Sequence, residues 1–209
     1  DNGYRHFFYP EFGLTQPLHS GKGWVWQGGI RVPMVARGPG IESGSVCDEN
    51  VIKYDFLPTF VDWAGGNPKD LSDIDGVSLA GLMQGEKADK AFSDRYLYFH
   101  YPHYRSGMPT SAIVSGKKKV MHFYEAPGIP MWFDLAVDEA EVNNIAEEKP
   151  EEHRAMFDEM MRYFEEVGAR IPKINPDADL DVYLKDRDAD MRAEWGPFEG
   201  ERPLEEDEI

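Results

Sequence analysis

Residues 96–135 contain four short runs that decide the fold: YLYFHY (96–101), SAIVS (111–115), KKVMHFY (118–124) and MWFDL (131–135). Aromatic and β-branched residues are frequent in the runs, and glycine or proline occurs in every gap between them. This pattern is typical of short strands joined by turns. The sequence therefore predicts a small antiparallel sheet.

A long helix is predicted after the sheet, from Pro150 to Gly168. Proline suits the first turn of a helix, and Glu151 and Glu152 complement its positive end. Apolar residues recur along it at helical spacing and form a stripe that we expect to cover the sheet: Met156, Phe157, Met160, Met161, Phe164 and Val167. Residues 95–170 are thus predicted to form one subdomain.

The preceding part of the chain predicts mixed α/β structure. Residues 30–37 alternate and contain a proline, which favours a short strand at a sheet edge or bulge. A helix is expected from Asp55 to Ala64, with Asp55 as its cap. Its predicted buried face consists of Leu57, Phe60, Val61 and Ala64. A further helical turn is expected at 78–83.

Charge and composition exclude several classes of protein. The 209 residues carry a net charge of −17, and residues 176–209 hold 13 acidic and 4 basic side chains. We therefore expect no nucleic-acid partner and no anionic membrane surface as a partner. No apolar run reaches the roughly 18 residues of a membrane span. Residues 171–209 are predicted to form an acidic, extended tail.

Asp1, Asn2 and Lys22 suggest an anion site assisted by a metal ion. Carboxylate and amide oxygens are ligands for Ca²⁺ or Mg²⁺. A lysine ammonium suits sulfate or phosphate, and the glycines on both sides of Lys22 let a ligand approach closely. A metal and an ammonium around one anion would stabilise the charge of ester hydrolysis. The alternatives are an Asx turn at Asp1 and an ordinary surface lysine.

Five ordered blocks resemble the C-terminal portion of type I, formylglycine-dependent sulfatases of the alkaline phosphatase superfamily. The resemblance implies that residues 1–94 are the C-terminal end of the catalytic α/β domain of an alkaline-phosphatase-like sulfatase fold. The blocks are Asp1–Gly3, Pro17–Pro33, Tyr54–Thr59, Asp75–Leu79, and Phe133–Leu135 running to Asn144–Ala146.

The resemblance implies hydrolysis of sulfate monoesters to an alcohol and inorganic sulfate. Asp1 and Asn2 would ligate Ca²⁺, and Lys22 would act as a catalytic, sulfate-binding residue. A carbohydrate sulfate, small or polymeric, is the expected substrate. His100 and His103, beside tyrosines, could recognise sugar hydroxyls or the ester oxygen, or could be aromatic packing. His19 is expected at the rim of the pocket.

The chain departs from that family in its nucleophile. Formylglycine arises from a Cys/Ser-x-Pro-x-Arg motif, whereas the single cysteine, Cys47, is followed by Asp48, Glu49 and Asn50. We expect the formylglycine in a missing N-terminal half of the same protein, which would be a partner of this chain. The chain alone is predicted to be inactive. The family suggests a periplasmic or secreted protein, but the residues leave the location open.

Two other functions fit the same residues. A phosphonate or phosphate ester hydrolase of the same superfamily would need a similar metal and ammonium. A non-catalytic, sulfatase-like binding module would keep the fold without turnover. The upstream nucleophile motif would separate the sulfatase from the other hydrolase.

Overall fold

The computed structural model describes residues 17–104 and 108–173. The predicted metal ligands Asp1 and Asn2 and most of the acidic tail lie outside these ranges. Within them, no helix is both long and apolar enough to cross a bilayer.

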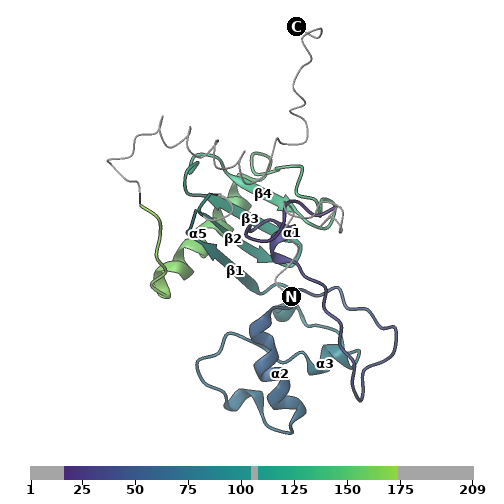
Figure 1. Cartoon of the computed structure of the whole chain (residues 1–209). Helices are drawn as coiled ribbons and strands as arrows, with labels where there is room; N and C mark the ends of the chain where they lie inside the picture. Colours follow the sequence, from purple (N-terminus) through teal and green to yellow (C-terminus); the bar gives the residue numbers. More distant parts are fainter. Residues whose placement is uncertain (1–16, 105–107, 174–209) are drawn as a thin grey trace.

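The predicted antiparallel sheet is confirmed, and its strands follow chain order (Figure 1). They are β1 (Tyr96–Tyr101), β2 (Thr110–Ser115), β3 (Lys118–Phe123) and β4 (Met131–Asp134). Ser115 pairs with Lys118, so a two-residue turn joins β2 to β3. Gly116 in this turn has φ +54°, which glycine adopts without steric cost.

The long helix is also confirmed, as α5 (Pro150–Glu166), and it packs on one face of the sheet. Met156, Met160 and Phe164 of the predicted stripe are buried there, whereas Val167 lies beyond the helix and is 54% exposed. Their partners from the strands are Ile113, Val120 and Trp132.

The opposite face of the sheet carries the segment around α1 (Gln27–Ile30). Val25 and Trp26 are buried against side chains of β2, β3 and β4, namely Ala112, Met121, Phe123 and Phe133. The sheet is therefore the middle layer between α5 and the α1 segment (Figure 1).

A helical lobe precedes the sheet. It contains η2 (Lys53–Asp55), α2 (Phe56–Trp63), η3 (Pro68–Asp70), α3 (Ala80–Met83) and α4 (Lys90–Ser93). The helices predicted at 55–64 and 78–83 are confirmed as α2 and α3, and Gly65, at φ +80°, follows the end of α2.

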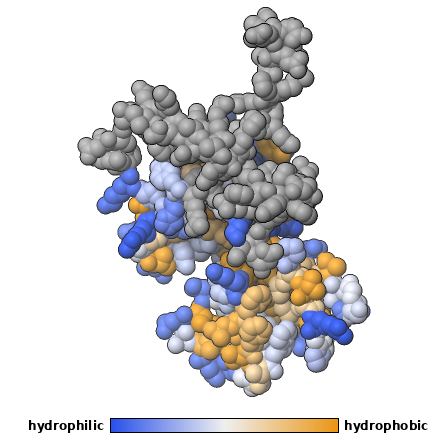
Figure 2. All heavy atoms as spheres, in the orientation of Figure 1, coloured by the Kyte–Doolittle hydropathy of each residue, from blue (hydrophilic) through white to orange (hydrophobic). Residues whose placement is uncertain are grey.

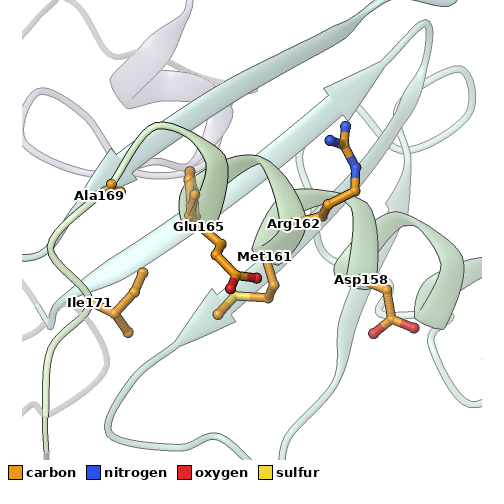
Figure 3. Close-up of a pocket in the computed structure, with 8 residues that line it drawn as sticks. Asp158, Met161, Arg162, Glu165, Ala169 and Ile171 are labelled. Atoms are coloured by element: carbon orange, nitrogen blue, oxygen red, sulfur yellow. The ribbon is translucent and has the colours of Figure 1, made fainter.

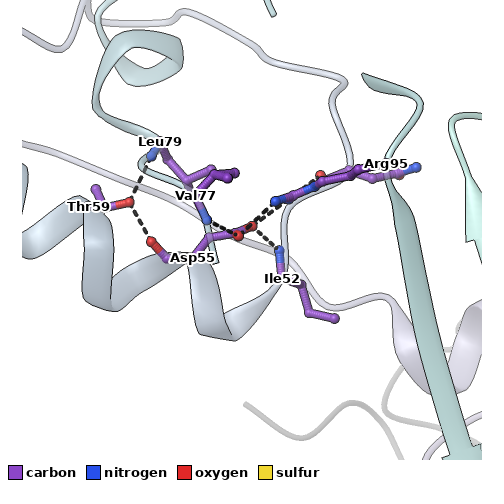
Figure 4. A network of polar contacts seen from close by, with 7 residues as sticks. Ile52, Asp55, Thr59, Val77, Leu79 and Arg95 are labelled. Atoms are coloured by element: carbon purple, nitrogen blue, oxygen red, sulfur yellow. Dashed lines mark hydrogen bonds and ion pairs between the residues drawn. The ribbon is translucent and has the colours of Figure 1, made fainter. Parts of the chain in front are cut away.

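The predicted buried face of α2 is wrong. Leu57 and Phe60 are 52% and 58% exposed, whereas Pro58 and Thr59 are buried. The orientation of α2 is set by hydrogen bonds. The Thr59 hydroxyl donates to the Asp55 carbonyl at 2.6 Å and accepts from the Leu79 amide at 2.8 Å. These hydrogen bonds hold the polar side of α2 against the start of α3 and leave its apolar side outward (Figure 4).

Two other local predictions are also wrong. The Asp55 side chain makes no capping bond to α2; it accepts from the amides of Ile52 and Val77 and pairs with Arg95. Residues 30–37 form no strand: Ile30 ends α1, and residues 31–37 are exposed. A strand needs a hydrogen-bonded neighbour, and the described chain places none beside this segment.

Candidate functional site

The loop that carries Lys22 closes on itself. The Gly28 amide donates to the His19 carbonyl at 2.9 Å, and the Trp24 amide donates to the Gly21 carbonyl at 3.2 Å. A Cβ atom added at Gly28 would lie 2.2 Å from the Ser20 carbonyl oxygen, well inside van der Waals contact. Gly28 is therefore required for this close approach of two backbone segments.

Trp26 fixes the loop to the sheet. Its ring stacks on His19 at a centroid distance of 4.1 Å and meets Phe123 and Phe133 at 5.9 and 5.7 Å. Trp26 is only 9% exposed, so its large ring adds buried apolar area between the loop and the sheet. Trp26 thus joins the loop to the hydrophobic core on this face of the sheet.

Lys22 itself has no partner for its charge in the described part of the chain. The residue is exposed, and within residues 17–104 and 108–173 no carboxylate or carbonyl accepts a hydrogen bond from its ammonium. An unpaired cation on a loop held by buried contacts can attract an oxyanion without first breaking an ion pair.

A buried ion pair lies under the same loop. Lys119 on β3 and Glu141 both have fully buried side chains, and the Lys119 ammonium donates to Glu141 Oε1 and to the Val25 carbonyl. Burial lowers the pKa of Lys119 to about 8, against the opposing charge of Glu141. The sequence analysis missed both residues, although the alternation of β3 puts Lys119 on the same face as Met121 and Phe123.

The predicted histidines occupy different places. His19 lies on the Lys22 loop, stacked on Trp26. His103 is exposed and meets the ring of Tyr101, which packs on the cluster beneath that loop. His100 packs against Phe164 of α5, on the opposite face of the sheet. The structure therefore places His19 on the same loop as Lys22 and His100 on the other face of the sheet.

Both ring nitrogens of His100 have protein partners. Nε2 is 3.0 Å from the Arg170 carbonyl, and Nδ1 is 2.7 Å from the Ser111 hydroxyl. Because a carbonyl only accepts, Nε2 carries the proton and Nδ1 accepts from Ser111. These contacts correspond to the packing alternative for His100; its role toward a substrate stays a prediction.

A cavity of about 600 Å³ lies elsewhere, along the C-terminal half of α5 and the segment after it (Figure 3). Met161, Ala169 and Ile171 contribute apolar lining. Its cation, Arg162, already pairs with Glu159 at 2.6 Å and with Glu166 at 2.8 Å. This cavity therefore offers no free positive charge for an oxyanion.

The described part of the chain gathers no group of three or more His, Cys, Asp or Glu side chains that could hold a metal ion. Carboxylate and amide oxygens such as those of Asp1 and Asn2 suit Ca²⁺ chemically, but their placement lies outside the described ranges. Metal ligation by these two residues stays a prediction.

Residues 19–169 match a protein family described as N-sulphoglucosamine sulphohydrolase, C-terminal. The chain is 32% identical over 161 residues to an N-acetylglucosamine-6-O-sulfatase of Bacteroides thetaiotaomicron, covering 74% of this chain and 28% of that protein. It is 29% identical over 167 residues to arylsulfatase A of Bos taurus, covering 69% of this chain and 32% of the relative.

The fold is similar to a solved structure described as Ps i-CgsB in complex with k-i-k-neocarrahexaose. The TM-score is 0.60 at 25% identity, and the match covers 71% of this chain and 32% of that one. The chain thus spans about a third or less of each of these relatives.

Proposed function

Since the chain belongs to the N-sulphoglucosamine sulphohydrolase C-terminal family, we propose that the full-length protein is a sulfatase. It hydrolyses sulfate monoesters to an alcohol and inorganic sulfate, and this chain supplies part of the anion-binding site. The observation that carries the proposal is the exposed Lys22, whose ammonium has no partner among the described residues, on a loop held by Gly28 and Trp26. The names of the two curated relatives reported above, both sulfatases, support the same reaction.

Lys22 acts on the sulfate group directly. Its ammonium pairs with a nonbridging sulfate oxygen and stabilises the negative charge of the sulfuryl group while the ester S–O bond breaks and the ester oxygen leaves. Gly21 and Gly23 on either side of Lys22 carry no side chains of their own, which would let the substrate approach the loop backbone. Lys22 is thus both a substrate-binding and a catalytic residue in this proposal.

Two groups of the proposed site belong outside the described residues. Asp1 and Asn2 would hold Ca²⁺ together with ligands from the upstream part of the protein. Bound there, Ca²⁺ would supply a second positive charge to the sulfate, and a formylglycine from upstream would supply the nucleophile. This chain contains no Cys/Ser-x-Pro-x-Arg motif, so it is proposed to be inactive by itself.

A sulfated carbohydrate is the proposed substrate class. The N-acetylglucosamine-6-O-sulfatase relative and the solved structure in complex with neocarrahexaose support it. Among the described histidines, His19 and His103 lie on the Lys22 side of the sheet and are proposed to face the sugar. His100 is a less favourable candidate for binding the sugar than His19 and His103, because both of its ring nitrogens already have protein partners.

The upstream part of the protein is the proposed partner of the helical lobe. Leu57, Phe60 and Trp63 of α2 are 52%, 58% and 45% exposed, and Figure 2 shows hydrophobic side chains gathered over this lobe. Three large, exposed apolar side chains gathered on one short helix are typical of a surface that another part of a protein covers. Their burial against the preceding part of the same polypeptide would explain why the polar side of α2 faces inward.

The test is turnover by the full-length protein with its formylglycine in place. Inorganic sulfate should be released from glucosamine-6-sulfate derivatives and from an aryl sulfate, and a phosphonate monoester should be a much poorer substrate. Preferred turnover of the phosphonate would support the other hydrolase. No turnover of any ester, despite a formed formylglycine, would support the binding module and overturn the proposal.

A further inference from the structure

The Lys119–Glu141 pair makes both of its remaining contacts to one segment, the backbone on either side of Trp26. The Lys119 ammonium donates to the carbonyl oxygen of Val25 at 2.6 Å. Glu141 Oε2 accepts from the amide of Gln27 at 2.6 Å. Both side chains are 0% exposed, so neither contact competes with water.

The segment that the pair holds continues directly into the tip of the Lys22 loop. A Cβ atom added at Gly29 would lie 2.1 Å from the Trp24 carbonyl oxygen and 2.5 Å from that of Gly21. The loop tip is therefore packed against α1, and a shift of residues 25–27 must carry the tip with it. Few other arrangements of this loop are compatible with those contacts.

The turn that presents Glu141 is itself held firmly. The carboxylate of Asp138 accepts from the amides of Val142 and Asn143 at 3.1 and 2.8 Å. Glu141 has φ +56°, a conformation that non-glycine residues seldom adopt unless their surroundings require it. The hydrogen bonds of this turn thus fix the Glu141 carboxylate in place beside Lys119 and the Gln27 amide.

Stability alone is a weak reason for such a pair, because well-packed apolar residues often replace a buried ion pair without loss. Apolar side chains could fill the volume of Lys119 and Glu141, but they could not hold the Val25 carbonyl and the Gln27 amide. The ion pair therefore fixes the position of the backbone at Val25 and Gln27, which apolar side chains could not do.

We propose that Lys119 and Glu141 are positioning residues that hold the Lys22 ammonium where the sulfate oxyanion binds. The inference rests on the proposed role of Lys22 in sulfate binding. Neither residue touches the substrate; each acts through the backbone of the loop.

The experiment measures calorimetric binding of inorganic sulfate to the full-length protein, which needs no turnover. The main variant is Lys119→Met/Glu141→Leu, which keeps the site filled and uncharged. We expect it to stay folded, with a lower unfolding temperature because the buried Val25 carbonyl and Gln27 amide lose their partners, and to bind sulfate about tenfold more weakly, the effect of one lost charged hydrogen bond. Lys118→Met, next to Lys119 on β3 and paired with Glu152 at the surface, is the matched control and should bind normally.

A double-mutant cycle with Lys22→Ala separates the two claims. If the pair acts through Lys22, adding Lys22→Ala to the Met/Leu variant should weaken sulfate binding no further than Lys22→Ala does alone. Fully additive losses, or normal sulfate binding by a folded Met/Leu variant, would overturn the positioning role while leaving the proposed function intact. Unchanged binding by Lys22→Ala alone would instead overturn the role of Lys22.

If the Met/Leu variant fails to fold, Lys119→Met/Glu141→Gln, which leaves no buried charge without a partner, provides the same comparison through its change at Glu141. This change keeps the size of the side chain but removes its charge. Amide hydrogen exchange should become faster at Gln27 and its neighbours in the loop, while β1–β4 keep their protection. Unchanged exchange at Gln27 together with unchanged sulfate binding would contradict the inference.

Discussion

Arg95 donates hydrogen bonds from both terminal guanidinium nitrogens to the two carboxylate oxygens of Asp55, at 2.8 and 2.5 Å. Asp55 is fully buried and the Arg95 side chain is 15% exposed. Asp55 directly precedes α2 and Arg95 directly precedes β1, so this bidentate pair joins the helical lobe to the sheet (Figure 4). The apolar side of α2 is thereby held in a fixed orientation.

Asp55→Asn should lower the free energy of unfolding of the full-length protein by about 3–5 kcal/mol, because it leaves the Arg95 charge buried without its counterion. Urea unfolding followed by circular dichroism measures the loss. Asp62→Asn is the control, since the Asp62 side chain, at an exposed position on the same helix, accepts from the Ser78 hydroxyl and has no ion pair within the described residues. An equal loss of unfolding free energy in both variants would show that the Asp55–Arg95 pair stabilises the protein no more than an exposed hydrogen bond does.

Gly28→Ala should disturb the Lys22 loop, because the added methyl would meet the Ser20 carbonyl oxygen at 2.2 Å. We expect a loss of about 1–3 kcal/mol in unfolding free energy and a change in the fluorescence of the protein, because Trp26 lies in this loop. Gly128→Ala serves for comparison, since nothing lies within 4 Å of its added Cβ atom. If the Gly28 variant behaved like the Gly128 variant, the described closure of the loop would be incorrect.

The packing of α5 on β3 should weaken in mild acid. His122 and His153 flank Phe157, at centroid distances of 5.2 and 6.1 Å. Burial lowers the pKa of His122, with a further contribution from the charge of His153, and burial also lowers the pKa of His153. Below about pH 6.5 the unfolded chain therefore binds more protons than the folded one, so stability falls as the pH falls.

Thermal unfolding at pH 7.5 and 5.5 measures this effect. His122→Phe should lose less stability between the two pH values than the unchanged protein, because it has one histidine fewer to protonate in the interface. His103→Gln, on an exposed loop, should keep the original pH dependence. A His122→Phe variant with undiminished acid sensitivity would assign the effect to other groups.

The sheet and α5 could be predicted from sequence because their signals are local. The β-branched and aromatic residues of the strands, the glycine in the turn between β2 and β3 and the stripe of Met156, Met160 and Phe164 need no knowledge of distant residues. The sulfatase-like C-terminal fold, predicted from ordered motifs, is confirmed by the family match over residues 19–169.

The wrong face of α2 and the unpredicted burial of Lys119 share a physical origin in long-range polar contacts. The face of α2 was predicted from apolar periodicity, but Asp55 and Thr59 direct its polar side inward through Arg95 and Leu79. Lys119 lies in a run of three lysines that looks like a solvated surface, and its burial depends on Glu141. Such pairs join residues far apart in the sequence, so no local pattern contains them.

The role of Lys22 can be measured most directly as kcat/KM of the full-length protein for a sulfate monoester. Lys22→Ala should lower it by about a hundredfold or more, the usual cost of removing one donor to a developing oxyanion. Lys87→Ala, another exposed lysine of this chain, should leave it unchanged. Equal activity of the Lys22 and Lys87 variants would contradict the account, because the unpaired ammonium would then have no part in sulfate ester hydrolysis.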